Sequence, residues 1–211
     1  MRIGTTHTFN LGFIPECVAT FLSRHPTAKV SVQELSVAEV SAGLLDGDLD
    51  LGIAYRLSTG DALSFEPLLN EEMVLVVGPN HPFATRKRIR LVELHRQKLV
   101  LLPRAFATRG MLEECFEACG AVPQVVAEMN TIAPMLGLVE KTDIGAVVAA
   151  SAASPSSGLS LVLLESPTPL RTPGILRARS VQDQPFLVRS FLSIVRKVAT
   201  ARGIQPPHGR M

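Results

Sequence analysis

The first 55 residues alternate between short apolar runs and amphipathic segments at the spacing of βαβ units. Residues 2–4 begin as a strand, and residues 8–24 show the apolar period of a helix. A second strand is predicted over 29–36, a second helix over 37–45 and a buried strand over 51–54. Right-handed βαβ crossovers gather their polar loops at the carboxyl edge of a parallel sheet. This edge is therefore the expected place for a small ligand.

The ends of these helices carry local signals. Phe13, Cys17 and Phe21 form one stripe of the first helix, while Gly12 and Pro15 should keep its first turns irregular. Ser36-Val-Ala-Glu39 is a capping-box pattern that starts the second helix.

A second α/β set of similar plan begins near residue 78, after two strands at 63–69 and 73–77. Its predicted strands and helices are strand 99–102, helix 109–119, strand 125–128, helix 132–140, strand 144–148 and strand 159–164. The last helix spans about 185–202, and its apolar residues should return to the first compartment; they are Phe186, Phe191, Ile194, Val195 and Val198. We therefore expect subdomain I over 1–76 and 172–203, subdomain II over 77–171, and a flexible tail over 204–211.

Composition narrows the functional classes. Apolar residues make up 46% of the chain, and no apolar run approaches the roughly 18 residues that span a bilayer. There is no export signal, and three cysteines without a CxxC pair favour a reducing cytoplasm. The net charge is only +2, and the one basic cluster, Arg86–Arg90, is either a solvated loop or a phosphate-binding patch. No nucleic-acid-binding motif is visible.

Several segments match a known family. They are Phe13-Ile-Pro15 through Phe21 and His25-Pro26, Glu34-Leu35, Leu45-x-Gly47-x-Leu-Asp50-Leu-Gly-Ile, Glu66-Pro67-Leu68 and His81-Pro82. Over nearly the whole chain, the sequence resembles the effector-binding domain of LysR-type transcriptional regulators. Thr5–Phe9, Phe106–Arg109 and Glu128–Asn130 resemble its cyanate-responsive branch.

The resemblance implies an α/β fold of two Rossmann-like subdomains with a ligand cleft between them, similar to type 2 periplasmic binding proteins. It implies a small effector, an anion or a small carboxylate, and neither a cofactor nor a membrane. It also implies a homodimer of this domain and a tetramer of the full-length protein. Operator DNA would be bound only through an N-terminal winged helix-turn-helix, which is expected to be absent from this chain. The alternative is a periplasmic-type solute-binding protein for a small anion, which shares the fold.

Candidate effector contacts lie where predicted strands end and helices begin. They are Thr6, His7, Thr8 and Ser36 on the first subdomain, and Phe106, Thr108, Asn130 and Thr131 on the second. Hydroxyls and unpaired backbone N–H groups meet at such positions, where the helix dipole favours an anion. Thr6, Ser36, Asn130 and Thr131 could instead be simple N-caps, and His7 an exposed loop residue.

Two further residues have two possible roles each. Arg109 could neutralise an anion or stand as an exposed charge at a helix start, and Tyr55 could contact a ligand or pack at a hinge. Cys115 and Cys119, one turn apart, fit a packed face better than a redox pair. The histidines lack metal-ligand spacing, so no metal site is predicted. Without a GxSxG, Walker A, GxGxxG or HExxH motif, the chain is not expected to be an enzyme.

A dimer interface is expected on two helices. Phe13, Cys17, Met111 and Cys115 lie on apolar stripes wider than a two-subdomain monomer needs. The family resemblance implies that the first helix of one subunit faces the 109–119 helix of its partner.

Overall fold

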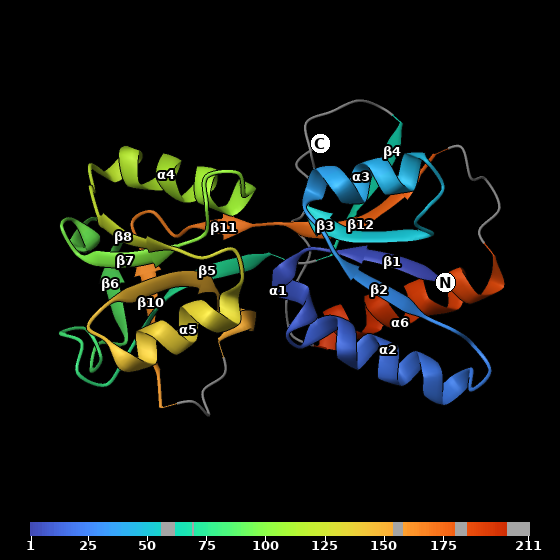
Figure 1. Ribbon diagram of the computed structural model, residues 1–211, viewed down its shortest axis with the longest axis horizontal. Coiled ribbons are helices and arrows are strands. Elements are labelled where there is room, and N and C mark those ends of the chain that lie inside the picture. Colours follow the sequence, from blue (N-terminus) through green and yellow to red (C-terminus); the bar gives the residue numbers. More distant parts are fainter. Residues whose placement is uncertain (56–61, 69, 154–157, 180–184, 202–211) are drawn as a thin grey trace. The chain divides into compact units, whose positions relative to one another are not determined.

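The computed structural model describes residues 1–55, 62–68, 70–153, 158–179 and 185–201, apart from the side chains of His7 and Thr8. The chain divides into two units, each described by itself below (Figure 1). Unit 1 comprises Met1–Glu71 and Arg171–Met211, and unit 2 comprises Glu72–Leu170. The tail expected over 204–211 lies outside the described residues.

Unit 1 is built on a five-stranded sheet of order β2-β1-β3-β12-β4. Its strands are β1 (Arg2–Thr5), β2 (Ser31–Glu34), β3 (Leu51–Tyr55), β4 (Leu63–Pro67) and β12 (Pro173–Ala178). β1 is parallel to β2 and β3, whereas β12 is antiparallel to β3 and β4. The predicted βαβ units are therefore present at the start of the chain.

Helices cover both faces of the unit 1 sheet. They are α1 (His7–Asn10), α2 (Phe13–Arg24), α3 (Val37–Leu45) and α6 (Phe186–Ala201). α2 and α6 cover one face and α3 covers the other (Figure 1). Successive strand residues point to opposite faces, so Ile53 packs with α2 and α6, while its neighbour Ala54 packs with α3. The predicted return of the last helix to the first compartment is confirmed.

The irregular start expected of the first helix at Gly12 is observed: the helix is broken at Leu11–Gly12, because Gly12 leaves helical geometry and becomes the N-cap of α2. One detail of the last helix differs from expectation. Phe186, expected in the core, is 66% exposed. It is the first residue of α6, two residues before the first buried position Val188, and its ring forms a T-shaped pair with His25 at a centroid distance of 5.8 Å.

Unit 2 repeats the plan of unit 1, as predicted. Its strands are β5 (Glu71–Val77), β6 (Arg88–Arg90), β7 (Lys98–Leu101), β8 (Gln124–Glu128), β9 (Gly145–Ala149), β10 (Ser160–Glu165) and β11 (Leu170–Arg171). The order is β6-β10-β5-β9-β7-β8, with β11 paired to β5. β7 is parallel to β8 and β9, and β5 is antiparallel to β9. The helices are α4 (Ala107–Cys119) and α5 (Ile132–Lys141), with short 3₁₀ turns η1 (Leu91–Leu94) and η2 (Ala150–Ala152).

The observed boundary between the units falls earlier than the sequence suggested. It lies between Glu71 and Glu72 rather than after residue 76. The reason is that β5 pairs with β9 and β10, so this strand belongs to the second sheet.

Three strands escaped the sequence prediction, namely β6, β11 and β12. Residues 88–90 of the basic cluster form the edge strand β6 rather than a loop, and Arg88 pairs with Glu165 at 2.7 Å. β12 begins with Pro173, and the first position of a strand is one that proline tolerates. Gly174 allows close approach to β4, because a Cβ at this position would collide with the carbonyl oxygen of Glu66. No helix among the described residues is long and apolar enough to cross a lipid bilayer.

Candidate ligand-binding site

The carboxyl edge of the unit 1 sheet gathers polar residues from three adjacent strands. β1 leads through Thr6 into α1, β2 leads to Ser36 at the start of α3, and β3 ends at Tyr55. Since these strands are parallel and neighbours, their ends lie at one edge.

The hydroxyl of Thr6 is buried and has no hydrogen-bond partner in the part of the chain that the structure describes. The residue is 8% exposed. Although Thr6 is the N-cap residue of α1, its side chain makes no cap hydrogen bond. A buried polar atom without a partner is costly and uncommon. The simple N-cap interpretation is therefore wrong for the side chain of this residue.

The other predicted effector contacts of unit 1 are His7, Thr8 and Ser36. The backbone of His7 and Thr8 belongs to α1, but their side chains lie outside the described residues. Ser36 forms the predicted capping box: its hydroxyl accepts from the Glu39 N–H at 3.3 Å, and its own N–H donates to Glu39 Oε2 at 2.8 Å. Both of these Ser36 groups are therefore used within the start of α3.

Tyr55 is engaged in packing and hydrogen bonding. Its hydroxyl donates to Glu71 Oε2 at 2.9 Å, and the Arg171 guanidinium carbon lies 3.2 Å from its ring centroid. Of its two possible roles, hinge packing is the one that this geometry fits. Sequence reasoning missed Glu71 and Arg171. The acidic pair Glu71-Glu72 before the apolar run 73–77 was the available signal for Glu71, which is buried at the start of β5.

The carboxyl edge of the unit 2 sheet carries the remaining predicted contacts. Phe106 is the half-buried N-cap residue of α4, and Thr108 is buried in its first turn. Asn130 is exposed after β8. Thr131 is the N-cap residue of α5 and, like Thr6, makes no side-chain cap hydrogen bond. The unit 2 edge thus offers a threonine hydroxyl that does not cap its helix.

Arg109 is neither exposed nor without partners. The residue is 4% exposed, so the alternative of a solvent-facing charge is wrong. Its Nη1 donates to the Leu102 carbonyl at 3.0 Å and to Glu128 at 2.9 Å, and its Nε donates to Glu113 at 2.9 Å. Arg109 therefore ties the start of α4 to the ends of β7 and β8, and two carboxylates neutralise its charge.

Two residues predicted for a dimer interface lie in the core of unit 1. Phe13 is 4% exposed and Cys17 is 0% exposed, both packed among residues of α2, α6 and the sheet. Their helical stripe is directed at α6 and the sheet, so these side chains offer no surface to a partner. Met111 and Cys115 are half-buried on α4, with their sulfur atoms 3.9 Å apart. Burial raises the pKa of the Cys115 thiol, which makes it less reactive.

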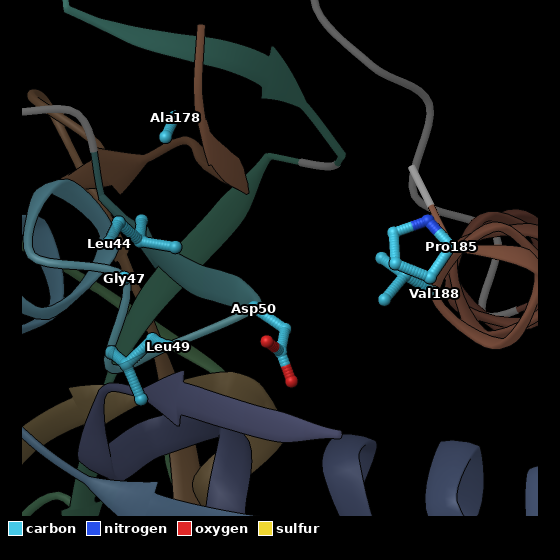
Figure 2. A pocket seen from close by; sticks show the side chains of 7 residues that line it. All are labelled: Leu44, Gly47, Leu49, Asp50, Ala178, Pro185 and Val188. Atoms are coloured by element: carbon cyan, nitrogen blue, oxygen red, sulfur yellow. The ribbon is translucent and has the colours of Figure 1, made fainter. Parts of the chain in front are cut away.

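A separate small cavity lies at the amino edge of the unit 1 sheet (Figure 2). Its volume is about 90 Å³, and it is lined by Leu44, Gly47, Leu49, Asp50, Ala178, Pro185 and Val188. Asp50 accepts hydrogen bonds from the Arg2 backbone N–H at 2.7 Å and from its guanidinium at 3.1 Å. These bonds hold the pKa of Asp50 below its usual range, although burial opposes the shift. None of the predicted effector contacts lines this cavity. The described residues contain no group of three or more side chains suited to a metal ion.

The fold matches that of solved effector-binding domains. The effector-binding domain of BenM with its effector benzoate aligns with a TM-score of 0.82 at 23% identity, covering 100% of this chain and 97% of that one. The effector-binding domain of QuiR in complex with shikimate aligns with a TM-score of 0.80 at 16% identity, covering 95% and 97%. These domains have the type 2 periplasmic-binding-like fold.

A family model named LysR substrate binding domain matches residues 1–200, and the chain belongs to this family. Curated relatives include the HTH-type transcriptional regulators GalR of Pseudomonas putida and SsuR of Burkholderia cenocepacia. GalR is 28% identical over 89% of this chain and 48% of its own length, and SsuR is 26% identical over 78% and 54%. The chain spans about half the length of the curated relatives it matches.

Proposed function

We propose that this chain is the ligand-sensing domain of a LysR-type transcriptional regulator, and that it binds a small anion or carboxylate through the carboxyl edges of its two sheets. The observation that carries the proposal is the Thr6 hydroxyl, which is buried at such an edge without a hydrogen-bond partner among the described residues. A ligand acceptor would satisfy this donor.

Unit 2 supports the same interpretation. Thr131 leaves its hydroxyl uncommitted to its own helix. α4 and α5, with 13 and 10 residues, both begin at this edge, so their N-terminal amides favour a negative group. Because Arg109 is neutralised by two carboxylates, amides and hydroxyls are better placed than this guanidinium to hold the ligand. Two solved neighbours are described with carboxylates, namely benzoate and shikimate.

The signalling role follows from the relatives. GalR and SsuR are described as HTH-type transcriptional regulators, and this chain aligns with about half of each. We propose that ligand binding favours one arrangement of the two units and passes that preference to a separate DNA-binding segment through the oligomer. The family match favours this role over that of a periplasmic solute-binding protein, which would share the fold.

The ligand proposal is tested by titration calorimetry with cyanate, benzoate, shikimate and inorganic anions. Thr6→Val and Thr131→Val each keep side-chain volume but delete a hydroxyl. Each should weaken binding of the responsive anion by roughly 1 to 3 kcal/mol, because a ligand acceptor loses its donor. Ser36→Ala is the matched control, since its hydroxyl is already used within α3. If both valine variants bind every responsive anion as tightly as the parent chain, the assignment of these two edges is wrong.

We also propose that this domain forms a homodimer, and that its interface uses exposed side chains in place of the buried Phe13 and Cys17. The edge strands β2 and β8 carry exposed apolar side chains, among them Val32 and Val126, and Leu22 is exposed on α2. Unpaired edges of this kind favour association. We propose that α2 and β2 of one copy meet α4 and β8 of another, which keeps Met111 and Cys115 in the interface and replaces Phe13 and Cys17 with exposed neighbours.

A further inference from the structure

Two chain segments connect the units, and they run together where they leave unit 1. The chain passes from unit 1 to unit 2 after Glu71 and returns at Arg171. β11, which ends at Arg171, pairs with β5, which begins at Glu71. The Thr172 hydroxyl donates to Asn70 Oδ1 at 2.9 Å, which joins the same two segments again. Residues 70–73 and 170–173 are called the connecting segments below.

One side chain of unit 1 contacts both connecting segments. The Tyr55 hydroxyl donates to Glu71 Oε2 at 2.9 Å, and the face of the Tyr55 ring lies 3.2 Å from the Arg171 guanidinium carbon. Tyr55 stands at the end of β3, within the unit 1 sheet. We call Tyr55, Glu71 and Arg171 the connection clamp, because they fasten a residue of each segment to the same strand end.

Two of the three residues of the connection clamp are buried, and its charges are matched. Glu71 is 3% exposed, Tyr55 is buried, and Arg171 is half-buried. Burial lowers the pKa of Arg171 below its ordinary value, while Tyr55 and Glu71 oppose that shift by favouring the charged form. Removing one partner of such a group leaves a desolvated charge behind, which is far more costly than breaking a surface pair. The clamp therefore constrains both segments together.

The clamp also touches the segment that carries the proposed ligand contact. The Phe9 ring lies 6.0 Å from the Tyr55 ring, centroid to centroid, and the Phe9 N–H donates to the Thr6 carbonyl at 3.1 Å. A continuous series of contacts thus leads from Thr6 through Phe9 and Tyr55 to Glu71 and Arg171, all within unit 1.

We propose that the connection clamp couples the Thr6–Phe9 segment to both connecting segments, so that a ligand held at Thr6 changes how tightly the two segments are fastened. The effect of a ligand at Thr6 rests on the proposed function. The linkage between the two connecting segments does not depend on it. In this role Tyr55, Glu71 and Arg171 are positioning residues rather than ligand contacts.

Hydrogen–deuterium exchange of the whole chain tests the linkage without a ligand. Glu71→Gln should speed exchange about tenfold in segment 170–173, and Arg171→Met should do the same in segment 70–73, because each segment depends on the shared clamp. Tyr55→Phe keeps the ring and removes only the hydroxyl, so it tests the linkage if the charge variants fold poorly. It should speed exchange in both segments to a smaller extent.

Glu66→Gln is the matched control. It breaks the ion pair with Arg196, which spans 2.7 Å in the same unit, and should leave both connecting segments unchanged. If each clamp variant alters only the segment that contains its own substitution, or if Tyr55→Phe alters neither, the proposed linkage is wrong.

The same exchange experiment, repeated with benzoate or shikimate added, tests the coupling to the ligand. If the parent binds either, the probe should slow exchange in both connecting segments, and Tyr55→Phe should lose most of that protection. Protection retained in Tyr55→Phe would overturn the coupling to Thr6. If the parent binds neither probe, the ligand class proposed above loses its support, and the exchange experiment without ligand still decides whether the segments are linked.

Discussion

Three residues that look alike in the sequence behave differently in the structure. Thr6, Ser36 and Thr131 each precede a helix as its N-cap residue, but of these three side chains only that of Ser36 makes a cap hydrogen bond to its own helix. The capping box at Ser36 is a local pattern, so the sequence predicts it correctly. Whether the hydroxyl of an N-cap residue points toward its helix depends on backbone angles and packing. The residue type alone does not determine these.

Arg109 should be important for the stability of unit 2. Arg109→Met removes a buried guanidinium that bonds the Leu102 carbonyl and two carboxylates. The free energy of unfolding should fall by roughly 1.5 to 3 kcal/mol, the range for lost hydrogen bonds to charged groups. Chemical denaturation measures the change.

Arg104→Met is the control for Arg109. Arg104 also pairs with Glu113, at 3.3 Å, but its side chain is 78% exposed. Its loss should cost less than about 0.5 kcal/mol, as for most surface pairs. Equal effects of the two substitutions would contradict a structural role specific to Arg109.

His81 should make stability depend on pH. Burial lowers the pKa of His81 below its ordinary value of 6.5, while Asp143 opposes the shift, and the ring Nδ1 accepts from the Phe83 N–H at 3.1 Å. The folded state therefore prefers the neutral ring. This contribution is present above about pH 6.5 and is lost as pH falls through the lower folded-state pKa.

Thermal unfolding between about pH 8 and pH 5 measures the contribution of His81. The melting temperature of the parent should fall more steeply toward acid than that of His81→Asn, whose side-chain oxygen can accept the same bond without titrating. Parallel curves for the two proteins would mean that His81 contributes nothing in this range.

At the scale of elements, the start of α3 is predicted to contribute measurably to stability. Ser36→Ala removes the hydroxyl that accepts from the Glu39 N–H, so the free energy of unfolding should fall by about 1 kcal/mol. Thr131→Ala makes a comparable change at an N-cap position whose hydroxyl does not cap, and it should cost clearly less. Denaturation of both variants tests the difference, and a larger loss for Thr131→Ala would reverse the assignment.

Helices with a clear apolar periodicity were predictable from the sequence. Strands that form only by pairing with a neighbouring strand were not. α3, α4, α5 and α6 all begin and end within two residues of the predicted bounds. β6 and β12 were missed because one is three residues of mostly basic sequence and the other begins with proline. Each becomes a strand only because a neighbouring strand offers it a hydrogen-bonding edge.

At the scale of the whole molecule, the oligomer provides the next test. Cys115→Arg places a charge on the half-buried face of α4 and should dissociate a dimer, because an unpaired buried charge costs several kcal/mol. Cys115→Ser is the control of similar size without a charge and should remain dimeric. Analytical ultracentrifugation at micromolar concentration distinguishes them, and a monomeric parent would contradict the proposed dimer.

The two-unit α/β plan, the strand-end location of the polar residues and the family could all be predicted from the order of residues. The reason is that apolar periodicity, capping patterns and turn residues act over a few positions of chain. The resemblance added the expectation of a ligand site.

The partners of the polar groups emerged only in three dimensions. Tyr55 bonds Glu71 and stacks on Arg171, Arg109 bonds Glu128, and the Thr6 hydroxyl is left without a partner among the described residues. These outcomes depend on strands that are distant in sequence and adjacent in the sheet. A residue's type sets which bonds it can make, whereas packing sets which groups are within reach and which are sealed from water.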